Sequence, residues 1–176
     1  MLGATKSAAT LRREELRDSY WRNAIPWTGK NATGWFFAPR TLPLLLLLLR
    51  SKALSGRQDP SRVYLALLAR HVDSGIVEIA NEADLAYESG YTGQRAVRTW
   101  QERMQLLQRL GLIKIQPSGN QQYRYVLLVH PSLVIEKLHK QGGVIDGNWW
   151  SAYVARRQET KESSYQKPKR KAASGV

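Results

Sequence analysis

Several arginine and amide side chains between residues 91 and 124 have the chemistry to contact a nucleic-acid duplex. Arg95 and Arg98 lie three residues apart, so they share one face if this segment is helical. A guanidinium group can donate two hydrogen bonds to O6 and N7 of guanine, or to a pair of phosphate oxygens. These residue types and this spacing indicate a surface that binds nucleic acid.

Chemistry that depends on thiols or on a metal has little support. The chain has no Cys, which excludes disulfides, thiolate zinc sites and Cys nucleophiles. Its three histidines, His71, His130 and His139, are spread along the chain, so a His-rich metal centre is not expected. We therefore expect neither a metal nor any other cofactor.

A nucleic-acid-processing enzyme, such as a nuclease or a replication initiator, is the enzymatic alternative. Such reactions need clustered carboxylates for metal ions, or a Tyr nucleophile beside a His metal site. The acidic residues that lie near one another are Glu82, Asp84 and Glu88, and no His-x-His or Asp-x-x-Asp arrangement accompanies them. Compensation of a helix dipole explains Glu82 and Asp84 more simply. We therefore expect a binding protein without catalytic activity.

The charge balance points to a polyanionic partner. The 176 residues include 27 Lys and Arg against 14 Asp and Glu, which gives a formal net charge of +13. Such an excess repels itself in the free protein, and nucleic acid is its most common partner, ahead of an anionic membrane surface. The excess is regional: residues 76–90 contain acidic side chains and no cationic ones, whereas residues 91–129 and the C-terminal residues are strongly basic.

The most apolar segment is too short to cross a membrane. It runs from Leu42 to Leu49, less than half of the ~20 residues that a spanning helix needs. It also lies too far from the N-terminus, and lacks the cleavage site, of a secretory signal. We expect a cytoplasmic protein without a membrane partner.

The chain length suits one compact domain with an arm at each end. Residues 1–40 form a basic and aromatic arm, residues 41–159 a folded domain, and residues 160–176 a basic tail that is expected to be disordered. Aromatic residues interleaved with cations in the arm could stack single-stranded bases, which keeps an RNA or single-strand binding protein as an alternative. Packing onto the domain or a second subunit is the simpler role for the arm.

Periodicity and capping signals predict the elements of the domain. Asn81 is a helix cap, Thr92 caps the longest helix, and Gly111 ends that helix. A hairpin with a tip of five or six residues follows. The predicted helices span residues 41–54 (capped by Thr41 and buried all round), 61–72 (capped by Ser61), 82–89, 92–110, 131–141 and 149–159, and the predicted strands span residues 76–79, 112–116 and 123–129.

This order, and the motif residues within it, resemble the winged helix-turn-helix proteins. The motif runs from Ile79 to Thr92, continues through Arg95 to Trp100, and ends in the step Leu110-Gly111-Leu112-Ile113. The resemblance covers residues 61–129. It implies a fold that is mainly α with a small β-hairpin wing (α+β), extended by extra helices at both ends. It also implies that the longest helix enters the major groove of DNA.

The longest helix is amphipathic. Val97, Trp100, Met104 and Leu107 form a core-facing stripe, and the cationic residues lie opposite it. A solvated outer face is the simplest alternative to DNA contact. The candidate DNA-binding residues are Gln94, Arg95, Arg98 and Thr99 for base edges, Tyr91 and Thr92 for phosphate, Arg109 on the same outer face, and Asn120, Gln121, Gln122 and Arg124 in the wing.

The implied function is sequence-specific binding of double-stranded DNA. In general character the chain is similar to small bacterial proteins of plasmids and integrative elements. This likeness implies a transcriptional regulator or a replication or partition factor, located in the bacterial cytoplasm with the nucleoid or a plasmid. Many proteins of this class bind inverted repeats as two-fold dimers. A homodimer is therefore considered, with residues 41–54 and 149–159 as the apolar surfaces available for it.

Overall fold

The computed structural model describes residues 7–20, 22, 34, 36, 38–71 and 75–162. The chain divides into two compact units, residues 1–35 and residues 36–176. The described part of the first unit contains one helix, α1 (Ala8–Tyr20), and none of the side chains of α1 is buried. Ser7 caps this helix, because its Oγ accepts a hydrogen bond from the Thr10 backbone N–H at 3.3 Å. The basic tail beyond Glu162 lies outside the described residues.

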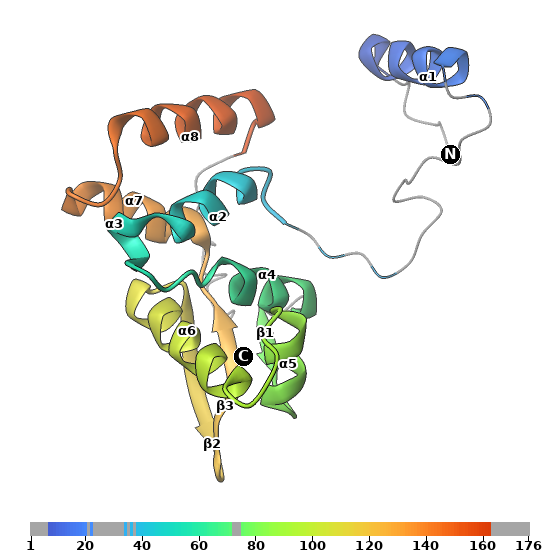
Figure 1. The fold of residues 1–176 in the computed structure, drawn as a ribbon. Coiled ribbons are helices and arrows are strands. Elements are labelled where there is room, and N and C mark those ends of the chain that lie inside the picture. Colours follow the sequence, from blue (N-terminus) through green and yellow to red (C-terminus); the bar gives the residue numbers. More distant parts are fainter. Residues whose placement is uncertain are drawn as a thin grey trace, which may run out of the picture. The chain divides into compact units, whose positions relative to one another are not determined.

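The second unit is mainly helical with a small antiparallel sheet, which confirms the predicted α+β class (Figure 1). Its described helices and strands follow in the order α2 (Leu42–Arg50), α3 (Lys52–Ser55), α4 (Ser61–Arg70), β1 (Ile76–Glu78), α5 (Glu82–Glu88), α6 (Ala96–Leu110), β2 (Ile113–Ser118), β3 (Gln121–Leu128), α7 (Pro131–Gln141) and α8 (Gly147–Thr160).

The segment predicted as one buried helix over residues 41–54 forms two helices instead. Ser51 is extended, with ψ 141°, and its side chain accepts a hydrogen bond from the Leu54 backbone N–H, so Ser51 starts α3. The Thr41 side chain does not cap α2, because Thr41 has helical backbone angles (φ −86°, ψ −1°) instead of the extended ones typical of a capping residue. Its hydroxyl donates to Glu162 Oε1 at 3.0 Å. Burial all round was also wrong, since Leu47 is 59% exposed.

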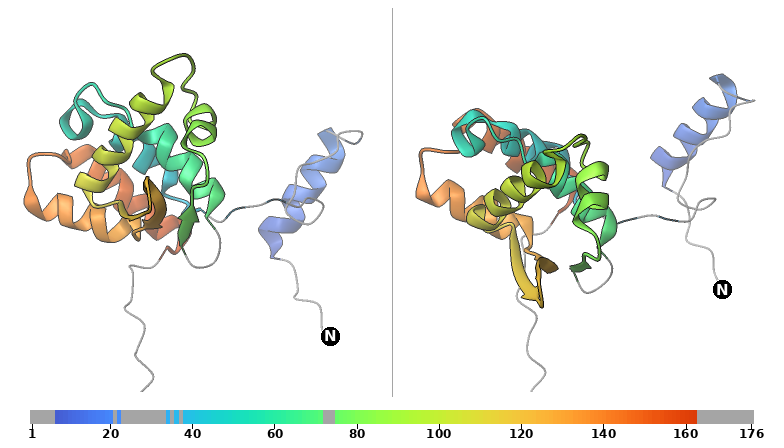
Figure 2. Two further views of the ribbon diagram at one scale, coloured as in Figure 1. Left: turned by 90° about the horizontal axis from the view of Figure 1, so that it is seen from below. Right: turned by 60° about the horizontal axis from the view of Figure 1, so that its bottom comes forward.

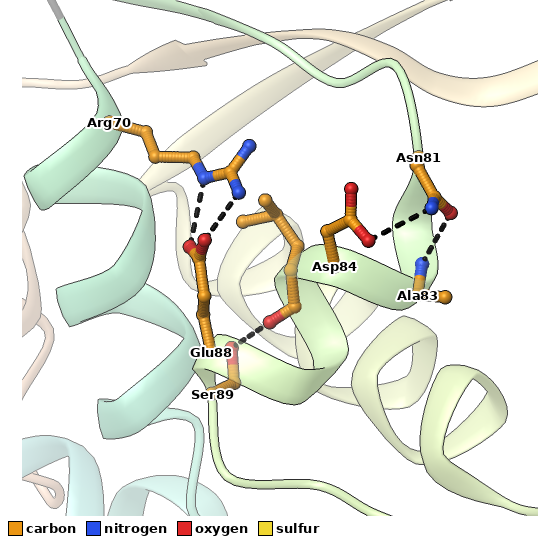
Figure 3. Close-up of polar contacts among 7 residues, drawn as sticks. Arg70, Asn81, Ala83, Asp84, Glu88 and Ser89 are labelled. Carbon is orange, nitrogen blue, oxygen red and sulfur yellow. Dashed lines mark hydrogen bonds and ion pairs between the residues drawn. The ribbon is translucent and has the colours of Figure 1, made fainter.

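Local capping sets the starts of α4 and α5. Ser61 was predicted as the cap of α4 but is its first residue, and the Asp59 carboxylate accepts from the Ser61 backbone N–H at 2.9 Å. The prediction for Asn81 is confirmed, because its side chain accepts from the Ala83 backbone N–H at 3.0 Å (Figure 3). The predicted stop after α4 falls partly on residues 72–74, outside the described residues.

Helix α6 begins four residues later than predicted. Gly93 adopts φ +80°, a left-handed conformation that interrupts the helix, so Thr92 lies in the preceding turn rather than at the cap. The predicted end is confirmed: Gly111 has φ +81° and closes the helix with hydrogen bonds to the carbonyls of Leu107 and Gln108.

The three strands form a sheet in the order β1-β3-β2, with both pairs antiparallel. The β2–β3 hairpin has a two-residue turn, Gly119 and Asn120, instead of the predicted tip of five or six residues. Pro117 lies within β2, where the register shifts between Gln116 and Ser118. An edge strand tolerates Pro at such a bulge, because the missing N–H needs no partner there. The hairpin projects beyond the helices (Figures 1 and 2).

One apolar core joins the helices of this unit to the sheet. From α6 the fully buried side chains are Trp100, Met104 and Leu107, three of the four residues of the predicted stripe. The fourth, Val97, is partly buried and packs against the core. Trp100 meets Tyr123 of β3 edge to face, with ring centroids 5.3 Å apart. The core therefore holds the inner face of α6 against the sheet.

Helix α8 packs on α2 and α7. It begins at Gly147, two residues before the predicted start, because the Asp146 carboxylate accepts from the Trp149 backbone N–H at 2.8 Å. The Trp149 indole donates to the Leu44 carbonyl of α2 at 3.1 Å, and Trp150 stacks on His139 of α7. Much of the apolar surface of the two segments considered for a dimer is thus buried within this unit, including Leu45, Leu48 and Leu49 of α2 and Trp149 and Tyr153 of α8.

A glycine pair tests the end of α6. We expect Gly111→Ala to destabilise the protein by about 1 kcal/mol, because an L-residue is strained at φ +81°. Gly147→Ala is the matched control, since Gly147 begins α8 without a positive φ and has open space around it. Urea unfolding should show unchanged or slightly raised stability for the control. Equal losses in the two variants would contradict the left-handed ending of α6.

Candidate nucleic-acid interface

Helix α5 is fixed to α4 by an ion pair between Arg70 and Glu88 (Figure 3). Arg70 Nε donates to Glu88 Oε2 at 2.8 Å, and Arg70 Nη2 pairs with the other carboxylate oxygen. Hydrogen bonding from Arg70 lowers the pKa of Glu88, and the same bonds raise the pKa of Arg70. The negative charge of Glu88 is therefore paired with a cation of the neighbouring helix.

The other two acidic side chains of α5 also have partners. Asp84 Oδ1 accepts from Asn81 Nδ2 at 2.9 Å, and Glu82 Oε2 accepts from Gln101 Nε2 of α6 at 2.6 Å. Glu82 and Asp84 both lie in the first turn of α5, where a negative charge interacts favourably with the helix dipole. The bond to Gln101 links α5 to α6, so these acids help to position the two helices.

The turn between α5 and α6 contains three of the predicted site residues. Thr92 and Gln94 are exposed there, whereas Tyr91 is hydrogen-bonded within the fold. Gly90 has φ +81°, and the Tyr91 backbone N–H donates to the Ala86 carbonyl at 3.0 Å. The Tyr91 hydroxyl donates to the Asp59 carbonyl at 3.4 Å, and partial burial raises the pKa of this phenol.

The outer face of α6 is polar and carries two of its arginines. Arg98, Glu102, Gln105 and Arg109 are spaced by four, three and four residues, so they form one stripe along the helix. Arg98 is the most exposed member of its ion pair, with 74% of its side chain exposed and its Nε 3.6 Å from Glu102 Oε1. Gln105, which the sequence analysis did not single out, is identifiable from the same spacing.

The structure leaves both key guanidinium groups at the surface. Arg95, at the N-cap position of α6, and Arg98, one turn into the helix, are both exposed. Thr99 was grouped with them but is half-buried, since it lies about 100° around the helix from Arg98. Neither arginine is covered by another of the described elements, so the N-terminal end of α6 is exposed in this part of the chain.

The hairpin residues fall into two groups. Asn120 and Gln122 are exposed near the tip. Gln121 Nε2 donates to the Ala80 carbonyl at 3.2 Å. Arg124 is half-buried, and it donates to the Ile79 carbonyl at 3.3 Å while its Nη2 lies 3.6 Å from Glu78 Oε2. Arg124 therefore braces β3 against the end of β1.

An additional exposed cation, Lys114, lies on β2. The sequence analysis did not list it, although alternation along the predicted strand places it on the opposite side from the buried Ile113. Helix α6 leads directly through Gly111 into β2, and the views show α6 beside the hairpin (Figures 1 and 2). The helix face and the hairpin together make one candidate interface.

This interface supplies hydrogen-bond donors and positive charge. Within the described residues, no group of three or more His, Asp or Glu side chains is placed to hold a metal ion. Also within these ranges, no helix has the length and apolar character needed to cross a membrane. Comparison with protein-family models, curated proteins and solved structures found no match to this chain.

The Arg70–Glu88 pair should contribute little to the free energy of unfolding, because water screens two partly exposed side chains. We expect a double-mutant cycle with Arg70→Ala and Glu88→Ala to give a coupling below about 1 kcal/mol at pH 7. Pairing lowers the pKa of Glu88 in the folded state. The coupling is therefore complete above the ordinary pKa of 4.5 and disappears as the pH falls through the lowered value.

Urea unfolding of the four proteins at pH 7, and at a lower pH at which NMR shows Glu88 to be protonated, measures this coupling in both protonation states. A coupling of the same size at the lower pH would show that it does not come from the charged carboxylate.

Proposed function

We propose that residues 61–129 form a winged helix-turn-helix that binds double-stranded DNA at a specific sequence. In this proposal α6 is the recognition helix and the β2–β3 hairpin is the wing. The observation that carries the proposal is the exposure of Arg95 and Arg98 on α6, opposite a stripe that is buried in the core. An α-helix fits the width of the major groove, where guanidinium groups read guanine.

The burial and bonding of each side chain support different roles at the duplex. Arg95, Arg98 and Gln94 are exposed at the start of α6 and contact base edges. Thr92, Arg109 and Lys114 contact phosphates, where a positive charge or a hydroxyl donor is sufficient. The exposed amides near the hairpin tip, Asn120 and Gln122, contact the backbone or the minor groove. Tyr91 and Arg124 act mainly by holding these elements in place.

The distribution of positive charge supports a polyanionic partner such as a DNA duplex. The net charge of +13 favours association with a polyanion, and the interface lies in the basic region of residues 91–129. By general likeness to small proteins of plasmids and integrative elements, the process served is control of transcription, replication or partition in the bacterial cytoplasm. Two copies on an inverted repeat would place their half-sites about one helical turn apart.

Arginine variants test the recognition helix. After random-site selection has identified a preferred sequence, we expect Arg98→Ala and Arg95→Ala each to weaken binding by about 1–3 kcal/mol, because each removes a base contact. Arg50→Ala is the matched control, since Arg50 is an exposed arginine on α2 and its loss changes the net charge equally. Fluorescence anisotropy with the selected duplex gives the dissociation constants. Unchanged affinity in both α6 variants would remove the recognition-helix assignment.

Salt dependence and competition test the nature of the partner. The logarithm of the binding constant should fall linearly with the logarithm of salt concentration, with a slope of about −0.9 for each phosphate neutralised. At equal salt, a duplex of the selected sequence should displace the labelled DNA better than RNA or single-stranded DNA of equal length. Preferential displacement by RNA would overturn the duplex proposal.

Nicking of plasmid DNA with Mg²⁺ or Mn²⁺ that tracks the protein through purification would instead establish the enzymatic alternative.

A further inference from the structure

A cavity of about 660 Å³ lies in the second unit, away from the α6 face. Its walls come from residues 38–40, from α4 and the residue after it, from the end of β3 with the start of α7, and from the end of α8. None of its described lining residues belongs to α5 or α6. Its volume is in the range of sites for small organic ligands.

The inner wall of the cavity combines apolar side chains with one buried phenol. Leu68 and Val129 supply apolar surface, and Tyr64 lines the cavity although only 1% of the residue is exposed. No hydrogen bond joins the Tyr64 hydroxyl to another of the described residues, so this donor is available to a ligand in the cavity. Burial raises the pKa of Tyr64, so this group stays protonated and able to donate a hydrogen bond.

The rim of the cavity carries an excess of positive charge. Arg40 and Lys161 both line it and are exposed, and neither has an ion-pair partner among the described residues. The carboxylate of Glu162 also lines the cavity, but its Oε1 accepts from the Thr41 hydroxyl at 3.0 Å and its Oε2 is buried. The two cations are thus available to an anion that enters from solvent.

Two imidazoles add polar groups that suit an oxygen-rich ligand. His71 Nδ1 lies 2.9 Å from the Leu68 carbonyl, and because a carbonyl can only accept, Nδ1 carries the hydrogen. His71 Nε2 is then left to accept a hydrogen bond. His130, also in the wall, has its Nδ1 2.8 Å from the Ser132 hydroxyl.

We propose that this cavity binds a small organic carboxylate that has an apolar body and a second oxygen. The carboxylate pairs with Arg40 and Lys161, the body packs against Leu68 and Val129, and the second oxygen accepts from the Tyr64 hydroxyl. The carboxylate and the second oxygen thus contact polar groups that have no partner among the described residues. The apolar body contacts the apolar part of the cavity wall. The inference does not depend on DNA binding.

Calorimetric titration of the full chain without DNA tests this site. The probes are 4-hydroxybenzoate, benzoate and hexanoate, with 4-hydroxybenzamide as a neutral analogue and inorganic phosphate as an anion without an apolar body. We expect saturable binding of 4-hydroxybenzoate, at least about ten-fold tighter than binding of 4-hydroxybenzamide or phosphate, because both the charge and the apolar body are needed. No saturable binding of any of the three carboxylates, or equal binding of the amide, overturns the proposal.

Variants assign the site to this cavity. Arg40→Ala combined with Lys161→Ala should weaken 4-hydroxybenzoate binding by at least about ten-fold, whereas Arg50→Ala combined with Lys52→Ala, a matched loss of two exposed cations on α2 and α3, should leave it unchanged. Tyr64→Phe keeps the buried ring and should weaken 4-hydroxybenzoate about ten-fold through loss of one hydrogen bond. Equal effects of the two double variants would overturn the assignment, as would full affinity in Tyr64→Phe. A failure here leaves DNA binding unaffected, so the two proposals fail separately.

Discussion

The burial of one stripe of α6 determines which of its residues face solvent. Trp100, Met104 and Leu107 are fully buried, and Trp100 packs edge to face on Tyr123 of the sheet. Burying a large apolar side chain contributes about 1.5–3 kcal/mol, whereas an exposed ion pair contributes less than about 1 kcal/mol. The core contacts therefore control the rotation of α6 about its axis, and a helical period of 3.6 residues then turns Arg98 and Arg109 outward.

The acidic residues that precede α6 all make polar contacts within the fold. All four acids of residues 76–90 have a partner: Glu78 pairs with Arg124, Glu82 with Gln101, Asp84 with Asn81, and Glu88 with Arg70. These contacts bridge β1, α4, α5, β3 and α6, so each of the four carboxylates has a polar partner within the fold. Arg95 and Arg98 remain as the exposed charges at the start of α6.

Features that depend on neighbouring residues were predictable from the sequence. The Asn81 cap and the left-handed Gly111 follow from local chemistry, and the outward position of Arg98 follows from helical spacing. Features that depend on distant partners were not. The hydrogen bond from the Thr41 hydroxyl to Glu162 joins residues far apart along the chain, so no local sequence pattern indicated it. Arg124 could be recognised as a brace only once β1 was paired with β3, since its partners lie on the strand β1 and just after it.

The bulge at Pro117 has a consequence for how the protein behaves when many copies are crowded together. Both outer strands of the sheet, β1 and β2, have one unpaired edge, which in general invites strand addition and aggregation. Pro117 removes a donor from one edge, the shifted register distorts the same edge, and the other edge is only three residues long and ends in Glu78. The sheet therefore offers a poor template to a second chain, which limits sheet-to-sheet polymerisation at high protein concentration.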